Sequence, residues 1–329
     1  MNIDVHGHIV VEEILRSSSH DDSWRPEISR LADGRQMILS NGKNEGPVPK
    51  EAVDWPTVIE NLDATNVDLM AVSPAPPCFL YHLDGKTGLH ACEVQNDAIA
   101  AAVARYPTRL AGLATLPMQD VDLAVKELER AVKELKMPGV EIGTNIQGTY
   151  LGDDSLRPFW AAVNDLDAFV FVHPFNPLGM DRYGQYHLVN LVGFVSDTAR
   201  SIADVVFSGL LEEFPRLKMC FSHGGGTAPY ILGRWEHGYH QRTETKVKVD
   251  KPPSEYFKLL YFDSITHSDR ALEFLVDTVG ADHIMIGSDY PFDMGPAEPV
   301  RSVEQNALIS DADKTKILGG NAEKLLKLA

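Results

Sequence analysis

Two histidines near the start of the chain have the type and spacing of metal ligands. His6 and His8 are separated by one residue, and the apolar residues around them predict a β-strand. Side chains two residues apart in a strand point to the same face, so both imidazoles would point in one direction. A neutral imidazole is a good ligand for a transition metal, and two on one face form half of such a site. The sequence therefore predicts that this strand contributes to a metal centre.

Three further polar residues could complete the centre. His173, His223 and Asp289 each stand at the C-terminal end of a different apolar run. A single histidine at a strand end usually has a structural role, but this many polar residues at the ends of four strands are harder to explain in that way. Three imidazoles and one carboxylate can coordinate Zn²⁺ and leave a position for water. Mn²⁺, Fe²⁺ and Co²⁺ suit a similar set, so the residue types leave the metal open.

The elements that carry these residues alternate between strands and helices. Besides the opening strand, the sequence predicts seven strands, at Asp68–Ser73, Leu110–Leu116, Gly139–Gly143, Ala168–His173, Leu217–His223, Leu259–Ser264 and Ile284–Ser288. It predicts helical segments at Asp54–Ala64, Glu93–Arg105, Val121–Leu135, Asp197–Phe214, Ser268–Val279 and Asp311–Ala329. Eight strands alternating with helices predict an α/β fold of the (β/α)8 TIM-barrel type, with catalytic residues at the C-terminal ends of the strands. An open doubly wound sheet is the alternative, but no G-x-G-x-x-G loop follows the first strand.

One long stretch does not fit this alternation. Residues 17–53 are mostly polar, contain Gly and Pro, and show little periodicity. Such a stretch is too long for an ordinary connection, and long loops often cover a binding site. We therefore expect a single metal-dependent barrel domain over residues 1–329, with a lid inserted after the first strand at residues 17–53.

Composition limits the possible partners and location. The 329 residues are 44% hydrophobic and 23% charged, as is ordinary for a soluble globular protein. The formal net charge of −17 argues against nucleic acid or an anionic membrane as a partner. Cys78, Cys92 and Cys220 are far apart in the sequence, so neither a disulfide framework nor a thiolate zinc site is expected. This use of cysteine favours a cytoplasmic location.

Several blocks of sequence together resemble one known family. The blocks are 6–8, 139–144, 171–174, 214–217, 223–226, 261–264 and 287–292. In them the chain is similar to the amidohydrolase superfamily and, within it, to the family of aminocarboxymuconate-semialdehyde decarboxylase. Jointly the blocks are specific for this family, and much less so for one substrate.

The resemblance implies a role for each candidate residue. The metal ligands would be His6, His8, His173 and Asp289. His223 would not bind the metal, but would act as the acid and base for the proton of metal-bound water, with Asp289 also part of the catalytic apparatus. Members with two metals carry a bridging lysine after the fourth strand, and residues 141–145 contain none. We therefore expect one divalent metal ion, with Zn²⁺ favoured, and no organic cofactor.

The resemblance also implies a substrate-binding arginine. Arg234 follows His223 by eleven residues, on the next expected helix. The matching arginine of the family binds a substrate carboxylate across a dimer interface, so we expect a homodimer in which Arg234 makes paired hydrogen bonds to the substrate. The alternative is a surface arginine without this role.

One departure from the family concerns the predicted lid. Family members carry a further substrate-binding arginine shortly before the first helix, but residues 45–51 contain no arginine. Lys43 and Lys50 are the available cations, and a lysine is a point charge rather than a two-pronged donor. The substrate contacts of the lid are therefore where this protein is expected to differ.

The expected function is non-oxidative decarboxylation of a small unsaturated or aromatic carboxylic acid by a metal-dependent carboxy-lyase. A hydrolase that cleaves a C–C, ester or amide bond on the same scaffold is the alternative, and a hydratase is closely related to both. Fold-level similarity alone does not decide among them. A metal-binding sensor without turnover is disfavoured by His223, which lies outside the four-ligand set.

Overall fold

The chain forms a barrel of parallel β-strands. The structure, a computed structural model, describes residues 1–17 and 19–328, apart from the side chains of Glu45 and Lys50. The eight strands are, in spatial order, β1 (Ile3–Ile9), β5 (Leu69–Pro74), β6 (Leu110–Ala114), β7 (Gly139–Gly143), β10 (Phe169–His173), β11 (Lys218–Phe221), β12 (Tyr261–Asp263) and β13 (Ile284–Met285). Bridges beyond β13 close the ring, because Val5 N donates to Ile286 O at 2.9 Å and His8 N donates to Tyr290 O at 2.7 Å. The predicted (β/α)8 fold is confirmed.

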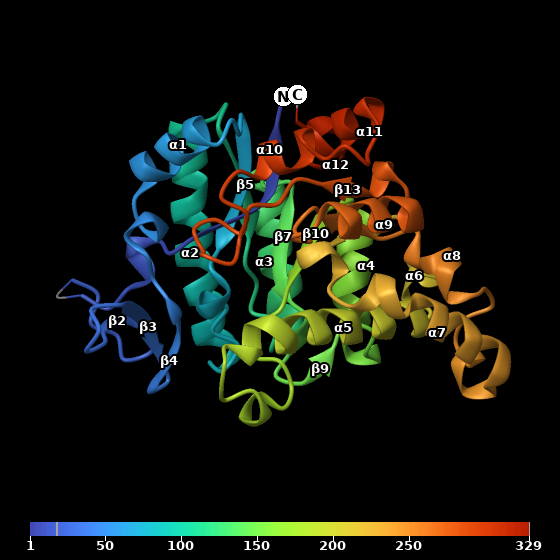
Figure 1. Ribbon diagram of the computed structural model, residues 1–329. Coiled ribbons are helices and arrows are strands. Elements are labelled where there is room, and N and C mark those ends of the chain that lie inside the picture. Colours follow the sequence, from blue (N-terminus) through green and yellow to red (C-terminus); the bar gives the residue numbers. More distant parts are fainter. Residues whose placement is uncertain (18, 329) are drawn as a thin grey trace.

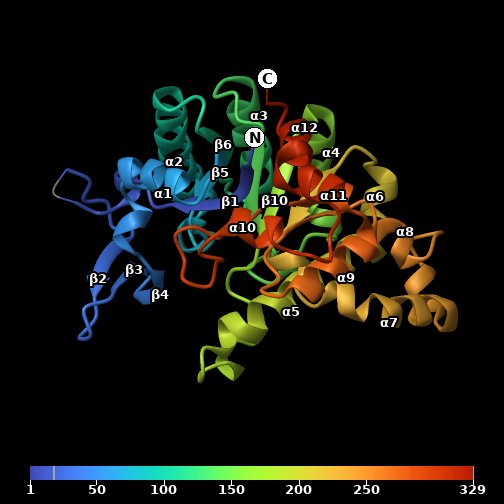
Figure 2. The ribbon, with the colours of Figure 1, turned by 45° about the horizontal axis from the view of Figure 1, so that its top comes forward.

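Helices surround the barrel (Figures 1 and 2). They are α1 (Trp55–Ala64), α2 (Gly85–Arg105), α3 (Val121–Lys133), α4 (Arg157–Leu166), α5 (Val195–Phe207), α6 (Leu210–Glu213), α7 (Ala228–Gln241), α8 (Pro253–Phe257), α9 (Asp269–Val279), α10 (Pro299–Glu304), α11 (Asp311–Thr315) and α12 (Asn321–Leu325). Within the described residues, no helix is both long enough and apolar enough to cross a bilayer.

The second helix begins earlier than the sequence predicted. α2 starts at Gly85 and not at Glu93, because the Asp84 side chain accepts hydrogen bonds from the amides of Lys86 and Thr87 and caps the helix there. The capping aspartate was a usable signal, although the glycines after it lower the helix propensity of the first turns.

Two other helical segments are interrupted, and α4, α8 and α10 were not predicted. The segment 197–214 is divided by Gly209, whose φ of 77° lies outside the helical range. The C-terminal segment is divided by a π-helical turn, η10 (Lys316–Gly320), and its last residue, Ala329, lies outside the described residues. α4, between β7 and β10, supplies a helix that the sequence reading omitted.

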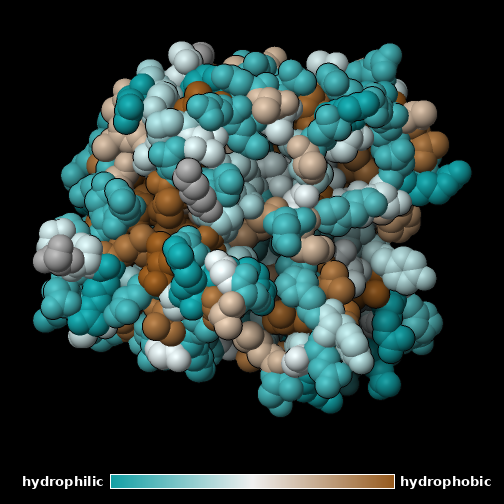
Figure 3. Space-filling model, turned by 60° about the vertical axis from the view of Figure 1, so that its left-hand side comes forward, coloured by the Kyte–Doolittle hydropathy of each residue, from teal (hydrophilic) through white to brown (hydrophobic). Residues whose placement is uncertain are grey.

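Part of the stretch 17–53 folds as a small antiparallel sheet. It consists of β2 (Glu27–Arg30), β3 (Gln36–Ser40) and β4 (Lys43–Pro47). The turn between β3 and β4 is Asn41-Gly42, with φ of 49° and 72°, the conformation that a two-residue hairpin turn requires. The sheet projects from one side of the barrel (Figures 1 and 2), and hydrophobic residues are visible among hydrophilic ones on that side of the molecule (Figure 3).

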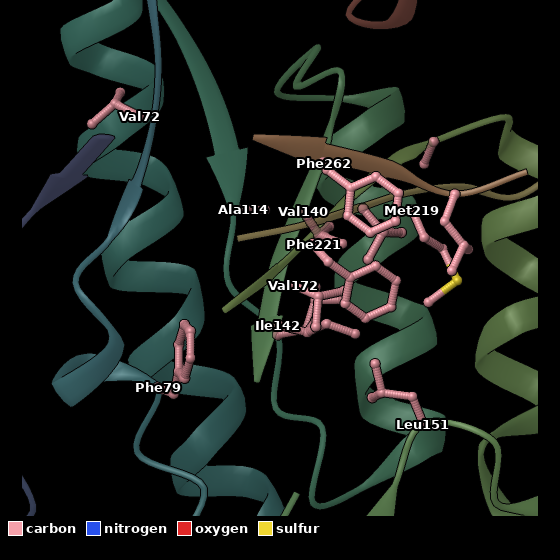
Figure 4. Close-up of a cluster of buried hydrophobic side chains, with 14 of the residues drawn as sticks. Val72, Phe79, Ala114, Val140, Ile142, Leu151, Val172, Met219, Phe221 and Phe262 are labelled. Carbon is pink, nitrogen blue, oxygen red and sulfur yellow. The ribbon is translucent and has the colours of Figure 1, made fainter. Parts of the chain in front are cut away.

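Two apolar clusters hold the barrel together. The larger lies between the strands and the helices and contains Val172 and Phe221 (Figure 4). The smaller fills the interior of the barrel and contains Val5 and Phe171. Because side chains alternate along a strand, His173 faces the same interior as Phe171 at the C-terminal end of β10. The interior of the barrel is therefore apolar, and polar residues such as His173 point inward at the C-terminal end of the strands.

Candidate metal centre

Four of the predicted residues meet at the C-terminal end of the barrel. His6 and His8 come from β1, His173 is the last residue of β10, and Asp289 follows β13. All four are buried, and one ligand atom from each lies within 4.8 Å of the others. A register shift in β1 between Asp4 and Gly7 accompanies the inward turn of both histidines. The barrel thus brings together residues from three strands that are distant in sequence.

The spacing of the ligand atoms suits a tetrahedral ion. Asp289 Oδ1 lies 3.2 Å from His6 Nε2, 3.2 Å from His8 Nε2 and 3.7 Å from His173 Nε2. Ligand atoms bound at ordinary zinc distances to one tetrahedral ion are about 3.3–3.6 Å apart. The three separations bracket that range.

The same four atoms lack hydrogen-bond partners among the described residues. The atoms are His6 Nε2, His8 Nε2, His173 Nε2 and Asp289 Oδ1, and all of them are buried. Buried polar atoms without partners are costly, and a divalent cation would satisfy all four together. The residues present therefore fit a metal ion.

Neighbouring oxygens fix the tautomers of two of these imidazoles. His6 Nδ1 lies 2.6 Å from Asp263 Oδ2, and His173 Nδ1 lies 2.9 Å from the carbonyl oxygen of Pro174. Each Nδ1–H donates to its oxygen, which leaves the Nε2 lone pair free for a metal. Asp263 is itself held by the backbone amides of Gly224 and Ile265, at 2.8 and 3.1 Å from Oδ1.

Burial and the charges within the cluster shift the pKa values of its residues in opposite directions. Burial disfavours the charged form of His6, but Asp289 and Asp263 outweigh burial and raise the pKa of His6 to about 10. Burial lowers the pKa of His173 to about 4. Burial would raise the pKa of Asp289, but the surrounding histidines, His6 foremost, hold it well below its usual value. A metal ion entering the site would therefore displace a proton from His6.

His223 lies beside the four residues and contacts the other carboxylate oxygen. Its ring centroid is 5.0 Å from that of His173 and 5.3 Å from that of His6. Its Nε2 is 3.4 Å from Asp289 Oδ2, and its side chain is 14% exposed. Asp289 thus faces the three ligating imidazoles with one oxygen and His223 with the other.

His223 and Asp289 share an uncommon backbone conformation. Their φ angles are 56° and 53°, in the left-handed region that histidine and aspartate enter more readily than most residues. The glycine run after His223 continues this conformation, and a Cβ on Gly226 would lie 2.1 Å from Val195 O. The turn therefore depends on glycine for space as well as for backbone freedom.

Arg234 is not brought to this cluster within one chain. It lies on α7 and is exposed, and none of the described residues forms an ion pair with it. Tyr230, one turn earlier on the same helix, is 86% exposed. α7 lies at the opposite side of the molecule from β2–β4 (Figures 1 and 2).

A cavity of about 210 Å³ opens at the same end of the barrel as the cluster. Its wall includes Ser40, Asn41 and Lys43 from the small sheet and Phe175 and Asn176 from the segment after β10. Lys43, one of the two cations that the sequence offers in the predicted lid, therefore lines a cavity. The side chain of the other, Lys50, lies outside the described residues.

Three buried carboxylates lie near the cluster; the strand phasing predicts that Glu141 and Asp263 face the barrel mouth, with Asp263 either orienting a ligand or bonding within the barrel core, whereas Asp4 was not predicted. Asp4 accepts hydrogen bonds from the His6 amide at 2.9 Å and from the Ser288 amide at 3.1 Å, and the Ser288 hydroxyl donates to its other oxygen. Asp263 and Glu141 contact ligand imidazoles. The sequence signal for these carboxylates is an acidic residue within an apolar strand, because a buried acidic residue rarely lacks a partner.

Comparison with known proteins places the chain in a family. A family model described as Amidohydrolase matches residues 3–328, so the chain belongs to the amidohydrolase family. A 2-amino-3-carboxymuconate-6-semialdehyde decarboxylase of Dictyostelium discoideum is 34% identical over 331 residues, covering 100% of this chain and 92% of the relative. A gamma-resorcylate decarboxylase of Polaromonas sp. strain JS666 is 31% identical over 300 residues, covering 84% and 91%.

A solved structure agrees with these relatives. Dihydroxybenzoic acid decarboxylase from Polaromonas sp. JS666, with bound manganese and the inhibitor 2-nitroresorcinol, aligns with a TM-score of 0.81 at 27% identity, over 99% of this chain and 97% of that chain. The predicted class, a metal-dependent non-oxidative decarboxylase among the carboxy-lyases, is confirmed by these similarities.

Proposed function

We propose that this protein removes CO2 from a small unsaturated or aromatic carboxylic acid, with one divalent metal ion and His223 at its centre. The observation that carries the proposal is the convergence of four unpartnered ligand atoms, with His223 beside them and outside the set. The ligands would be His6, His8, His173 and Asp289. When bound, the metal ion supplies positive charge that attracts substrate oxygens and lowers the pKa of bound water.

His223 has the position and chemistry of a proton carrier. Its Nε2 is 3.4 Å from Asp289 Oδ2, and its Nδ1 is 3.2 Å from Ser222 Oγ. An imidazole can release and accept a proton near neutral pH. When the bond between the substrate carbon and its carboxylate breaks, the electron pair stays on the carbon. That carbon then receives a proton, which we assign to His223. A conjugated substrate holds the developing charge itself, so no organic cofactor is required.

The surroundings of the centre favour a small planar acid. Phe175, two residues after His173, lines the cavity of about 210 Å³ at the barrel mouth, whose wall does not include the residues of the cluster. Phe292 packs against His8, with ring centroids 5.6 Å apart. Aromatic rings beside a metal site favour flat, conjugated ligands over branched ones.

We propose Zn²⁺ as the metal ion. Three imidazole nitrogens and one carboxylate oxygen form a nitrogen-rich donor set that suits zinc, whereas Mn²⁺ prefers more oxygen ligands. The dihydroxybenzoic acid decarboxylase from Polaromonas was solved with bound manganese, so Mn²⁺ is the competing assignment. Metal analysis of protein purified without added metal would decide: zinc supports the proposal, and stoichiometric manganese contradicts it.

We propose that the protein is a homodimer in which Arg234 of one chain binds the substrate carboxylate in the other. Arg234 is exposed on α7 and has no ion pair with any described residue. Tyr230 on the same helix is 86% exposed, and Leu191 is 50% exposed on the turn η6 (Val189–Phe194). Thr227 N donates to Val195 O at 3.2 Å, so the start of α7 lies close to the end of η6. Exposed apolar side chains grouped near an arginine are typical of an interface.

Mixed dimers test this arrangement. His223→Asn and Arg234→Ala are each expected to inactivate the protein, but a mixed dimer would pair an intact His223 with an intact Arg234 in one of its two sites. After unfolding and refolding together, the mixture should recover about a quarter of the wild-type activity, as two-fold symmetry and random pairing require. No recovery from a mixture that forms dimers would contradict the role of Arg234 across the interface.

We propose that the segment 17–53, inserted in the single barrel domain, acts as a lid. Ser40, Asn41 and Lys43 line the cavity together with residues of the barrel, which supports this role. Lys43→Ala should raise KM with little change in kcat if Lys43 binds the part of the substrate remote from the metal. An unchanged KM would argue against a contact with substrate.

We also propose a cytoplasmic location. All three cysteines are unpaired and buried, which supports a reducing compartment. Cell fractionation of the source organism checks this directly.

Release of CO2 from a panel of acids is the experiment that tests the proposed function. The panel comprises unsaturated and hydroxyaromatic carboxylic acids, including 2-amino-3-carboxymuconate-6-semialdehyde and 2,6-dihydroxybenzoate. Release that requires both bound metal and His223 supports the proposal. If metal-loaded protein released no CO2 but cleaved esters, amides or C–C bonds, the hydrolase alternative would replace it.

A further inference from the structure

Glu141 is a buried carboxylate that the proposed reaction does not use. It is the third residue of β7, pairs in register with Phe171 of β10, and has no exposed surface. Neither of its carboxylate oxygens accepts a hydrogen bond from a described residue within hydrogen-bonding geometry. A buried ionised carboxylate without a donor is costly, so a partner is expected.

The surroundings of Glu141 indicate that this partner is His8. Glu141 Oε2 lies 3.6 Å from His8 Nδ1. Both side chains are fully buried, so no solvent competes for the contact.

The other two imidazoles of the cluster show what this contact would do. The Nδ1 atoms of His6 and His173 lie 2.6 and 2.9 Å from an oxygen acceptor, whereas that of His8 is 3.6 Å from its nearest one. In all three rings Nε2 is turned towards Asp289 Oδ1. His8 is thus the one imidazole of the three whose Nδ1 makes no hydrogen bond to a described residue, and a carboxylate oxygen lies 3.6 Å from it.

We propose that Glu141 is the positioning residue of His8: it accepts the Nδ1–H of His8 when a metal ion is bound, and so holds the ring with Nε2 directed at the metal. Glu141 is not itself a ligand, because it lies outside the group of atoms that converge within 4.8 Å. A small rotation of the His8 ring closes the contact. The inference rests on the proposed metal site and adds a residue that determines how firmly the site holds its ion.

Two substitutions distinguish a role of Glu141 in positioning His8 from a role in the general stability of the protein. Glu141→Gln keeps an oxygen acceptor and removes the charge, whereas Glu141→Leu removes the acceptor at similar volume. Glu127→Gln is the matched control, because Glu127 is also buried but bonds to Asn96 and Arg130, away from the cluster. The metal affinity of each variant is measured with Co²⁺ or Zn²⁺ against a competing chelator, and the visible absorption of the Co²⁺ form reports the ligand field.

The expected result is a graded loss of metal affinity. Glu141→Leu should bind metal about 100-fold more weakly and Glu141→Gln about tenfold more weakly, the range found when partners of metal-bound histidines are removed. The Co²⁺ spectrum should change in both, and Glu127→Gln should match the wild type in affinity and spectrum.

Three results would overturn the inference. One is wild-type affinity and spectrum in Glu141→Leu; if that variant does not fold, wild-type values in Glu141→Gln have the same meaning. The second is complete loss of metal from Glu141→Gln, which would make Glu141 a ligand. The third is an equal loss in Glu127→Gln, which would make the effect one of general stability. Failure of the proposed function is distinguishable, because it would appear in the wild type as absence of bound metal or of CO2 release.

Discussion

Replacing His223 by asparagine should remove catalysis and leave the metal in place. Asparagine is the appropriate substitute because His223 has a φ of 56°, a conformation that asparagine tolerates and alanine does not. Asparagine also cannot carry a proton near neutral pH. Removal of a general acid or base typically costs 10²–10⁴-fold in rate, or about 2.7–5.4 kcal/mol of transition-state stabilisation.

The metal should be retained because only one polar contact joins His223 to the proposed ligands. That contact is 3.4 Å, to Asp289 Oδ2, whereas the three ligating imidazoles face Oδ1. The assay is initial-rate CO2 release across pH together with metal content, with His240→Ala on exposed α7 surface as the control. Activity within tenfold of the wild type, at any pH and with metal bound, would refute the assigned role, and loss of the metal would show that His223 is a ligand.

Four further outcomes follow from the geometry. Asp263→Asn, which weakens the 2.6 Å contact with His6, should reduce metal affinity about 10–100-fold in a chelator competition. Metal binding should release about one proton near neutral pH, because the pKa of His6 is raised to about 10 and its proton must leave; affinity therefore rises with pH, as calorimetry in different buffers will show. Gly226→Ala should lower the free energy of unfolding by more than about 1 kcal/mol in urea, because the new Cβ would meet Val195 O. Thiol reagents should not react with the native protein at pH 8, since burial raises the pKa of Cys78 to about 12 and the other two thiols are also buried, whereas all three should react in urea.

The strands and the four residues of the buried cluster could be predicted because their signals are local. β7 was predicted with the bounds that the structure has, and β10 within one residue, since short apolar runs between polar ends are typical of buried parallel strands. His6 and His8 were recognisable by their spacing within a strand, and His173 and Asp289 as polar residues at the end of an apolar run. The barrel then brings those ends together whatever the distance in sequence.

The residues that contact the cluster from outside were less predictable: the sequence suggested Asp263 as one that orients a ligand but could not identify its partner, and Asp4 was not predicted. Asp263 and His6 are 257 positions apart, and their contact depends on the register of the whole barrel. The small sheet β2–β4 was missed for a different reason. Its turn dipeptide Asn41-Gly42 is a strong hairpin signal, but the flanking strands are short and weakly apolar, so alternation did not stand out.

Closure of the barrel between β1 and the end of β13 has a consequence for how the protein acquires its metal. His6 and His8 of β1 are made before the other residues of the cluster, and Asp289 is made after β13. A growing chain therefore carries half of the proposed chelating set long before the other half exists. The four ligand atoms can converge only after Asp289 has been made and the barrel has closed, so a metal ion would be held in the complete site only from that point.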